Sequence, residues 1–255
     1  MAPIRVEDRE VVRSFLDASP VENAVVWGRV FQDPDYREVH VDGLPPRALL
    51  AMTRPETHGD ATGFALHAVD PEAAGPLVQL LPSGPAFGHV TDLTLVDVLR
   101  ARAEKIDARP AWLYRLDAKD FTDQRRHEVR PVDPKWAPTI AKLWDPEWPA
   151  EGYVRRRIEK GPSFGVYVDG ELVGWSMTHL ETDRVVMMGF LHVLEGHRGK
   201  GYARSLGSAL VKWILDHGRI PACHIYTDNA ASIELTESLG FRKVKQQVWG
   251  DFALR

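Results

Sequence analysis

The stretch Val193-Leu-Glu-Gly-His-Arg-Gly-Lys-Gly-Tyr-Ala-Arg204 decides how this chain of 255 residues is interpreted. It lies between a nearly continuous apolar run, residues 185–193, and an amphipathic pattern that predicts a helix over residues 201–217. Gly199 and Gly201 let the backbone turn tightly and approach a ligand closely. The N–H groups of such a turn, at the start of a helix, form an anion site. Three basic residues add positive charge there: Arg198, Lys200 and Arg204. The stretch therefore predicts a phosphate or pyrophosphate site.

Two familiar phosphate-binding motifs do not fit this stretch. The Walker A pattern G-x-x-x-x-G-K-[ST] requires Ser or Thr after its lysine, but Gly201 follows Lys200. The dinucleotide-binding pattern G-x-G-x-x-G requires a third glycine at the position of Arg204. The pattern that fits is R-x-x-G-x-A, formed by Arg198, Gly201 and Ala203.

With these residues the chain resembles the GNAT superfamily of CoA-dependent N-acyltransferases. In that family the strand before the loop ends in V-x-P-x-x-R-G-x-G-x-A, and here only the proline differs, since Glu195 replaces it. The family's second element, N-x-x-A/S followed by L-G-F, is similar to Asn229-Ala-Ala-Ser232 and Leu239-Gly240-Phe241. The order and separation of the two elements also match. The resemblance covers about residues 126–255.

The order of the elements and the resemblance together predict an α/β fold with an α+β mixed sheet, built from two GNAT-like domains in tandem. The polar, highly charged segment 117–126 is the predicted linker, so we expect domains at residues 1–123 and 124–255. The stretch Leu16-Asp-Ala-Ser-Pro-Val-Glu-Asn23 is loosely similar to the companion domain of the glycine N-acyltransferase-like branch. Because the first half has no R-x-x-G-x-G/A motif, we expect its domain to be degenerate and to lack a cofactor site.

The strands of the second half are expected to set which side chains face the same way. Residues 164–168 and 172–180 predict a hairpin around Asp169-Gly170. If Thr182-Asp183 is a two-residue turn, Thr178 lies opposite Met187 and Ser176 opposite Gly189. His179 and His192 would then face the other side of the sheet, unless a bulge reverses the direction of His192. In the first half, Pro76 and Pro82 predict that the segment after residue 70 is short or broken.

The resemblance implies that acetyl-CoA or another acyl-CoA is the co-substrate. Backbone groups of Leu191 and Val193, with His192 between them, would run along the pantetheine arm as a sheet edge binds a peptide. Asn229 and Ser232 would contact this arm or the loop that shapes it. The pyrophosphate would be held by the residues of the glycine-rich loop: Arg198, Gly199, Lys200, Gly201, Tyr202 and Ala203.

Two positions that carry chemistry in the family differ in this chain. Many relatives have a Glu or His base where Met187 stands here, and Gly189 two residues further on cannot accept a proton either. Glu181, near the expected acceptor side, and His192 are the candidates to replace this base. The family's tyrosine acid corresponds to Thr236, whose hydroxyl is a much weaker acid but can donate a hydrogen bond to sulfur.

The predicted function is transfer of an acyl group, expected to be acetyl, from acyl-CoA to the amine of a small molecule. We expect direct attack, because no activated nucleophile is visible. Cys223, on a β-like run, is expected to be a small buried hydrophobe. One alternative is a non-catalytic acyl-CoA-binding or regulatory module, which the residues at 187 and 236 favour. Another is an acyl-CoA enzyme with a hydroxyl or a peptide-terminal acceptor.

The composition limits the class of protein further. The chain is 44% hydrophobic and 27% charged, as in ordinary globular proteins. With 32 basic and 36 acidic residues its net charge is −4, so nucleic acid is not an expected partner. A single cysteine excludes a disulfide framework, and the scattered histidines predict no metal site. No signal segment and no run of membrane-spanning length is visible, so we expect a cytoplasmic monomer or homodimer without membrane contact.

Overall fold

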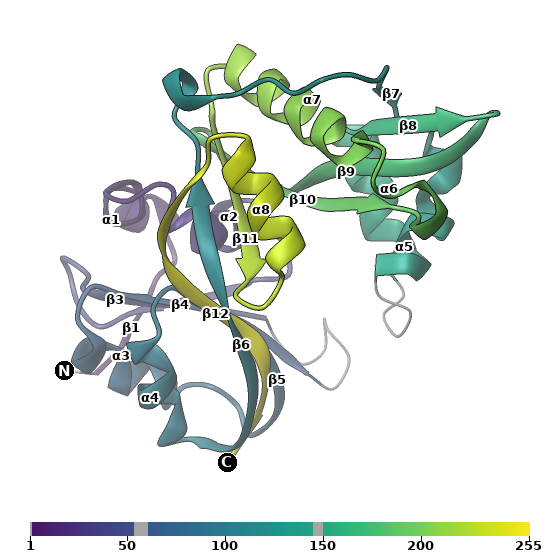
Figure 1. The fold of residues 1–255 in the computed structure, drawn as a ribbon. Helices are drawn as coiled ribbons and strands as arrows, with labels where there is room; N and C mark the ends of the chain where they lie inside the picture. Colours follow the sequence, from purple (N-terminus) through teal and green to yellow (C-terminus); the bar gives the residue numbers. More distant parts are fainter. Residues whose placement is uncertain (1, 54–60, 145–149) are drawn as a thin grey trace. The chain divides into compact units, whose positions relative to one another are not determined.

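A computed structural model describes residues 2–53, 61–144 and 150–255 (Figure 1). The chain forms two compact units, which are built from non-contiguous segments. Unit 1 contains Met1–Leu113, Tyr226–Asp228 and Val244–Arg255, and unit 2 contains Tyr114–Ile225 and Asn229–Lys243. The C-terminal strand thus completes unit 1. A division into continuous domains at residue 123 stays a prediction.

Unit 1 is a mixed sheet with helices on both faces. Its strands lie in the order β1-β2-β3-β4-β5-β12-β6, with β4 and β5 parallel. The strands are β1 (Ile4–Arg5), β2 (Glu38–Val41), β3 (Ala48–Met52), β4 (Thr62–Ala68), β5 (Gly84–Val90), β6 (Ala103–Arg115) and β12 (Arg242–Leu254). The helices are η1 (Arg9–Val12), α1 (Arg13–Asp17), α2 (Ala24–Phe31), α3 (Pro71–Val78) and α4 (Thr94–Arg100).

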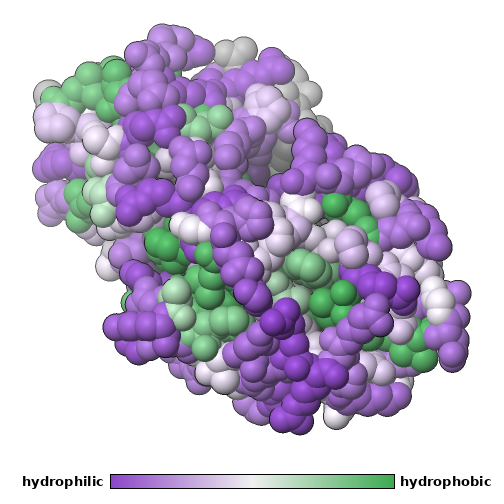
Figure 2. Space-filling view, turned by 90° about the horizontal axis from the view of Figure 1, so that it is seen from above, coloured by the Kyte–Doolittle hydropathy of each residue, from purple (hydrophilic) through white to green (hydrophobic). Residues whose placement is uncertain are grey.

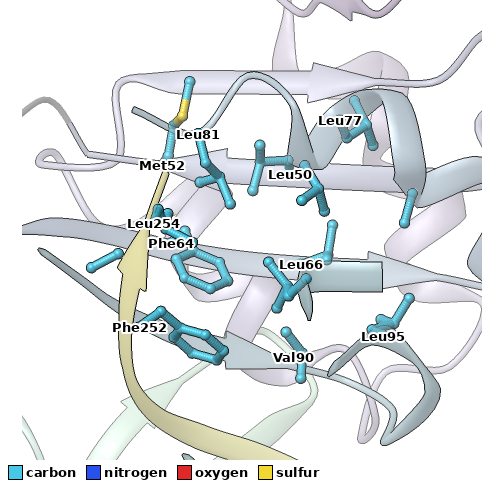
Figure 3. Packing of buried hydrophobic residues seen from close by; sticks show 14 of the residues in the cluster. Leu50, Met52, Phe64, Leu66, Leu77, Leu81, Val90, Leu95, Phe252 and Leu254 are labelled. Atoms are coloured by element: carbon cyan, nitrogen blue, oxygen red, sulfur yellow. The ribbon is translucent and has the colours of Figure 1, made fainter. Parts of the chain in front are cut away.

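Apolar side chains on both faces of the central strands form the core of unit 1. Alternate residues point to opposite faces: Leu50 and Leu66 belong to the cluster with α3 and α4, whereas Leu49 and Ala65 belong to the cluster with α1 and α2. This double burial explains the near-continuous apolar runs of β3 and β4. Figure 3 shows the first cluster, in which the rings of Phe64 and Phe252 lie 5.3 Å apart. On the face seen in Figure 2, hydrophobic residues form separate patches among hydrophilic ones.

Strand β5 forms in a segment for which the sequence gives no strand signal. Its sequence, Gly84-Pro-Ala-Phe-Gly-His-Val90, contains a proline and two glycines, which locally disfavour a strand. Pairing with β4 on one side and β12 on the other nevertheless holds it in the sheet. Gly88 is required there, because a Cβ on it would lie 2.1 Å from Cζ of Phe64. Tertiary pairing therefore outweighs local propensity in this segment.

Unit 2, described by itself, also has a mixed arrangement of strands that helices cover on two faces. Its strands lie in the order β11-β10-β9-β8-β7. They are β7 (Arg130–Pro131), β8 (Phe164–Val168), β9 (Glu171–Glu181), β10 (Val185–Val193) and β11 (Ile220–Tyr226). The helices are η3 (Ala118–Asp120), η4 (Pro134–Trp136), α5 (Ala137–Trp144), α6 (Glu151–Lys160), η5 (Glu195–His197), α7 (Tyr202–Asp216) and α8 (Ala230–Ser238). Trp175, Met177 and Phe190 pack with α5 and α6, whereas Val186 and Val193 pack with α7. These helices are labelled in Figure 1.

The segment predicted as a linker, residues 117–126, is attached to unit 2. The N–H of Gln124 donates to the Ser208 hydroxyl at 2.9 Å, and the N–H of Arg126 donates to the Ser205 hydroxyl at 3.0 Å. Both serines lie on α7 and are fully buried, so the segment covers this helix. In the described part of the chain, no helix is long and apolar enough to span a membrane.

Candidate functional site

The strands β10 and β11 separate part-way along their length. They pair in parallel from Val185–Ile220 to Met188–Cys223, and the register ends there although β10 continues to Val193. Beyond this point, no strand among the described residues continues that pairing on the β11-facing edge of β10. Since backbone N–H and C=O groups need hydrogen-bond partners, the opening suits an extended ligand that pairs as a strand would. Leu191 and Val193, predicted to contact the pantetheine arm, lie on this edge.

Two bulges change the predicted register of β9 and β10. Met187 pairs with Leu180, but Met188 pairs with Thr178, so β9 contains an extra residue at His179. Farther on, the extra residue is on β10, where the backbone of Phe190 has a φ of 51°. The predicted pairing of Thr178 with Met187 is wrong, and so is that of Ser176 with Gly189. The turn is centred on residues 183–184, closed by a 2.7 Å hydrogen bond from the Thr182 N–H to the Val185 carbonyl.

As a result, His179 and His192 both face the layer of α5 and α6. The ring of His192 stacks on Trp175 with centroids 4.9 Å apart, and the ring of His179 lies 5.7 Å from that of Trp144 on α5. The conditional prediction that a bulge reverses His192 is confirmed, whereas the direction predicted for His179 is wrong. Burial lowers the pKa of His192, and the charge of Arg198 lowers it further, so this imidazole is neutral near pH 7.

The glycine-rich loop leads directly into α7. Gly199 and Gly201 have φ values of 76° and 86°, in the left-handed region that favours glycine, and Gly201 directly precedes the helix. The Arg198 guanidinium donates to the Val193 carbonyl at 3.1 Å, which fastens the loop to the end of β10. Arg198, Lys200 and Arg204 are exposed. The first N–H groups of this helix and the basic side chains around them have the chemistry of an anion site.

His127 supports this loop and has no counterpart in the sequence interpretation. Its Nε2 lies 2.8 Å from the carbonyl oxygen of Lys200, so the ring donates to the loop. The ring also packs edge-on against Tyr202, with centroids 4.6 Å apart. A lone histidine about 70 residues before the loop gives no sequence signal of this contact, because the contact depends on how residues 117–126 cross α7.

Asn229 and Ser232 form the start of α8. The Asn229 side chain accepts a hydrogen bond from the Ser232 N–H at 3.2 Å, the usual geometry of a helix N-cap. The N-x-x-S pattern therefore has a local structural reason. Contact of either residue with pantetheine stays a prediction.

Glu181 bridges two arginines. Its Oε1 accepts from Nη2 of Arg157 at 2.9 Å, and its Oε2 accepts from Nη1 of Arg219 at 2.8 Å. The Thr178 hydroxyl adds a third hydrogen bond to Oε1 at 3.2 Å. Each of the three charged side chains is only about one fifth exposed, with values of 21%, 18% and 19%. This arrangement favours a role for Glu181 in joining α6, β9 and the start of β11.

Thr236 lies beside Cys223, the last residue of β11 that pairs with β10. The Thr236 hydroxyl forms a hydrogen bond with the thiol, and burial raises the pKa of Cys223 to about 12. The thiol is therefore not an activated nucleophile, in line with the sequence interpretation. The phenol of Tyr114, which the sequence analysis missed, donates to Glu237 at 3.0 Å next to Thr236. Burial and this hydrogen bond raise the pKa of Tyr114, which makes it a poor proton donor.

Aromatic rings surround the bulge of β10 on the α5/α6 face. The ring centroid of Phe190 lies 4.4 Å from that of Trp144 and 4.4 Å from that of His179. The ring centroid of Tyr153 lies 5.9 Å from that of Phe190. Trp144 is 40% exposed, so it borders solvent as well as this cluster. Trp148 lies outside the described residues.

Comparisons with known proteins address the fold. Residues 163–250 match the family described as FR47-like protein. A GCN5-related N-acetyltransferase from Kribbella flavida has a TM-score of 0.64 at 16% identity, over 93% of this chain and 98% of that one. A tandem GNAT protein from the clavulanic acid biosynthesis pathway has a TM-score of 0.57 at 16% identity, over 98% and 96% of the two chains. The chain has the fold of the GNAT superfamily.

A third structural comparison covers almost the whole chain. A Drosophila protein has a TM-score of 0.72 at 16% identity and covers 98% of both chains. No curated protein matches the sequence. Identities this low establish a fold, and the tandem relative shows that the fold occurs in this double form. Which donor and acceptor this GNAT-fold chain uses must be argued from its own residues.

Proposed function

We propose that this GNAT-fold chain transfers an acyl group from an acyl-CoA, with acetyl-CoA expected, to the amine of a small molecule. The observation that carries the proposal is the combination, in unit 2, of the unpaired edge of β10 with the loop Arg198–Ala203. The edge offers backbone groups to an amide-containing arm, and the loop offers N–H groups and positive charge to a pyrophosphate. Both parts fit CoA, which supplies the activated thioester.

Different residues of the chain would hold different parts of the CoA molecule. Backbone groups of Leu191 and Val193 orient the pantetheine arm, and the loop fixes the pyrophosphate. The amine nitrogen attacks the thioester carbonyl carbon, the C–N bond forms, the C–S bond breaks, and the nitrogen loses a proton. Because a thiol has a pKa of about 8.5, its thiolate leaves without strong acid assistance, so the weak acid Thr236 is compatible with turnover.

Replacement of Gly201 tests the CoA site with a matched control. Asp and Asn are nearly equal in size and both tolerate the left-handed backbone that Gly201 adopts with its φ of 86°. Only Asp adds a negative charge. Two charges about 4 Å apart interact with about 1 kcal/mol in water and about 4 kcal/mol at a protein surface, so we expect Gly201→Asp to weaken CoA binding about 100-fold relative to Gly201→Asn.

Calorimetric titration with CoA measures this difference, and release of CoA with a panel of amines measures turnover. Equal affinities for the Asp and Asn variants would refute the pyrophosphate assignment. Tight CoA binding by the unmodified chain without release for any amine would instead favour the non-catalytic acyl-CoA-binding module.

A further inference from the structure

Transfer to an amine requires a group that accepts the proton of the attacking nitrogen, and neither Met187 nor Gly189 is one. We infer that His179 is this proton acceptor, and that it reaches the reaction from β9 by lying across Gly189 of β10. The inference rests on the proposed function and adds a catalytic residue to the same site.

The contact between His179 and Gly189 carries the inference. A Cβ on Gly189 would lie 2.0 Å from Cδ2 and 2.3 Å from Nε2 of His179, so the imidazole fills the space that any side chain at position 189 would occupy. Gly189 directly follows Met188, where pairing with β11 ends. The ring therefore stands at the point where the two strands separate. An isolated glycine in an apolar strand is a known signal of such a close approach.

The β9 bulge and its neighbours hold this ring in place. The extra residue at His179 lets Thr178 and His179 both face the α5/α6 layer. The Tyr153 hydroxyl donates to the His179 carbonyl at 3.0 Å, and the Arg157 Nε donates to the Thr178 carbonyl at 2.9 Å. Two side chains of α6 thus fix the backbone around the bulge. His179 is half-buried.

The surroundings also suit a group that becomes positively charged. The ring of His179 lies 4.4 Å from that of Phe190 and 5.7 Å from that of Trp144, and aromatic faces attract cations. Glu181 of β9 and Arg157 of α6 are paired with each other. His192, in contrast, lies beyond the β10 bulge near Arg198, whose charge opposes its protonation.

The proposed step balances as follows. The nitrogen lone pair of the amine forms the C–N bond, and His179 accepts one proton from that nitrogen. The C–S bond breaks with its electron pair on the CoA sulfur. The imidazolium returns its proton to solvent, and the thiolate takes a proton from solvent, which leaves the amide and free CoA.

The test moves the proton acceptor from one strand to the other. His179→Gln keeps a polar side chain of similar size but cannot accept the proton, so we expect turnover to fall about 100-fold or more with CoA affinity unchanged. Its pH profile should lose the limb that reports the base. In the double variant with His179→Ala and Gly189→Glu, the new carboxylate enters the space vacated by the ring. We expect this variant to regain at least tenfold activity over His179→Ala alone.

Three results would overturn the inference: turnover of His179→Gln within about threefold of the unmodified chain, an equal loss of turnover and CoA affinity, or a double variant no more active than His179→Ala. If the unmodified chain itself releases no CoA with any amine, the proposed function fails, which is a distinct result.

Discussion

Replacement of Glu181 tests whether this carboxylate stabilises the fold or accepts a proton in the reaction. Its two oxygens accept from Arg157 at 2.9 Å and from Arg219 at 2.8 Å. Replacing Glu181 with Ala leaves both guanidinium groups without this partner while only about one fifth of each side chain is exposed, 18% and 19%. The physical cost of the substitution is thus the loss of two charge-assisted hydrogen bonds and of charge neutralisation.

The size of this cost lies between two known limits. Exposed ion pairs contribute about 0–1 kcal/mol, whereas removing one partner of a buried pair costs about 3–5 kcal/mol. The limited exposure of the Glu181 cluster places it toward the buried limit, so we expect the free energy of unfolding to fall by about 2–3 kcal/mol. The control is Glu234→Ala, since Glu234 is 79% exposed and pairs with Arg204 at 3.4 Å. We expect the control to change stability by less than about 0.5 kcal/mol.

Urea unfolding followed by circular dichroism measures both variants, and CoA release at a temperature where each is fully folded measures turnover. The expected result for Glu181→Ala is a clear loss of stability with turnover within about tenfold of the unmodified chain. A stability loss below about 1 kcal/mol, or a fall in kcat above about 100-fold in the folded variant, would refute the structural interpretation and restore Glu181 as a proton acceptor.

Three further predictions concern other parts of the chain. Gly240→Ala should lower the free energy of unfolding in urea by more than about 4 kcal/mol, because its Cβ would lie 1.9 Å from a backbone carbonyl oxygen. Gly170→Ala has open space around it and should lower this free energy only by the left-handed strain of about 1–2 kcal/mol, so similar losses for the two variants would contradict the prediction. Burial lowers the pKa of His67 to about 4, so the unfolded chain binds its proton first and stability falls as pH drops from 6.5 toward 4. This loss of about 3 kcal/mol in the free energy of unfolding should disappear in His67→Asn. If the pH dependence of unfolding is the same in His67→Asn, His67 is not its cause. Thr236→Ala should lower CoA release by less than about tenfold, and a loss above about 10³-fold would identify its hydroxyl as a required proton donor.

Those parts of unit 2 whose conformation is set by residues close in sequence were predictable from the sequence. The hairpin around Asp169-Gly170 forms as expected, because both residues adopt positive φ, 51° and 85°, which the short turn between β8 and β9 requires. The helix after Gly201 and the cap at Asn229 also follow from local chemistry. In these segments the residue types themselves select the backbone conformation.

Long-range pairing was not predictable in the same way. Strand β12 completes unit 1 although it follows the whole of unit 2 in sequence, and its register with β5 joins residues more than 150 positions apart. The bond between His89 and Gln247, 2.9 Å long and buried, depends entirely on this pairing. No local propensity encodes such a partner.

The direction of His179 shows why the candidate base was missed. In a strand, a shift of one residue moves every side chain to the opposite face. The predicted turn at Thr182-Asp183 lies one residue before the observed centre, which moves each pairing by two residues and leaves the faces unchanged. The extra residue on β9 shifts the register by one and turns His179 to the other face, and the extra residue on β10 shifts it by one again. The second bulge restores the register that the first one shifted, so the pairing is the same before and after the two bulges. Only the two β10 residues between the bulges have a different register, and the sequence pattern does not reveal it. At these two residues, Met188 and Gly189, β10 separates from β11. The packing of α6 on β9 determines that His179 is the side chain that reaches this point.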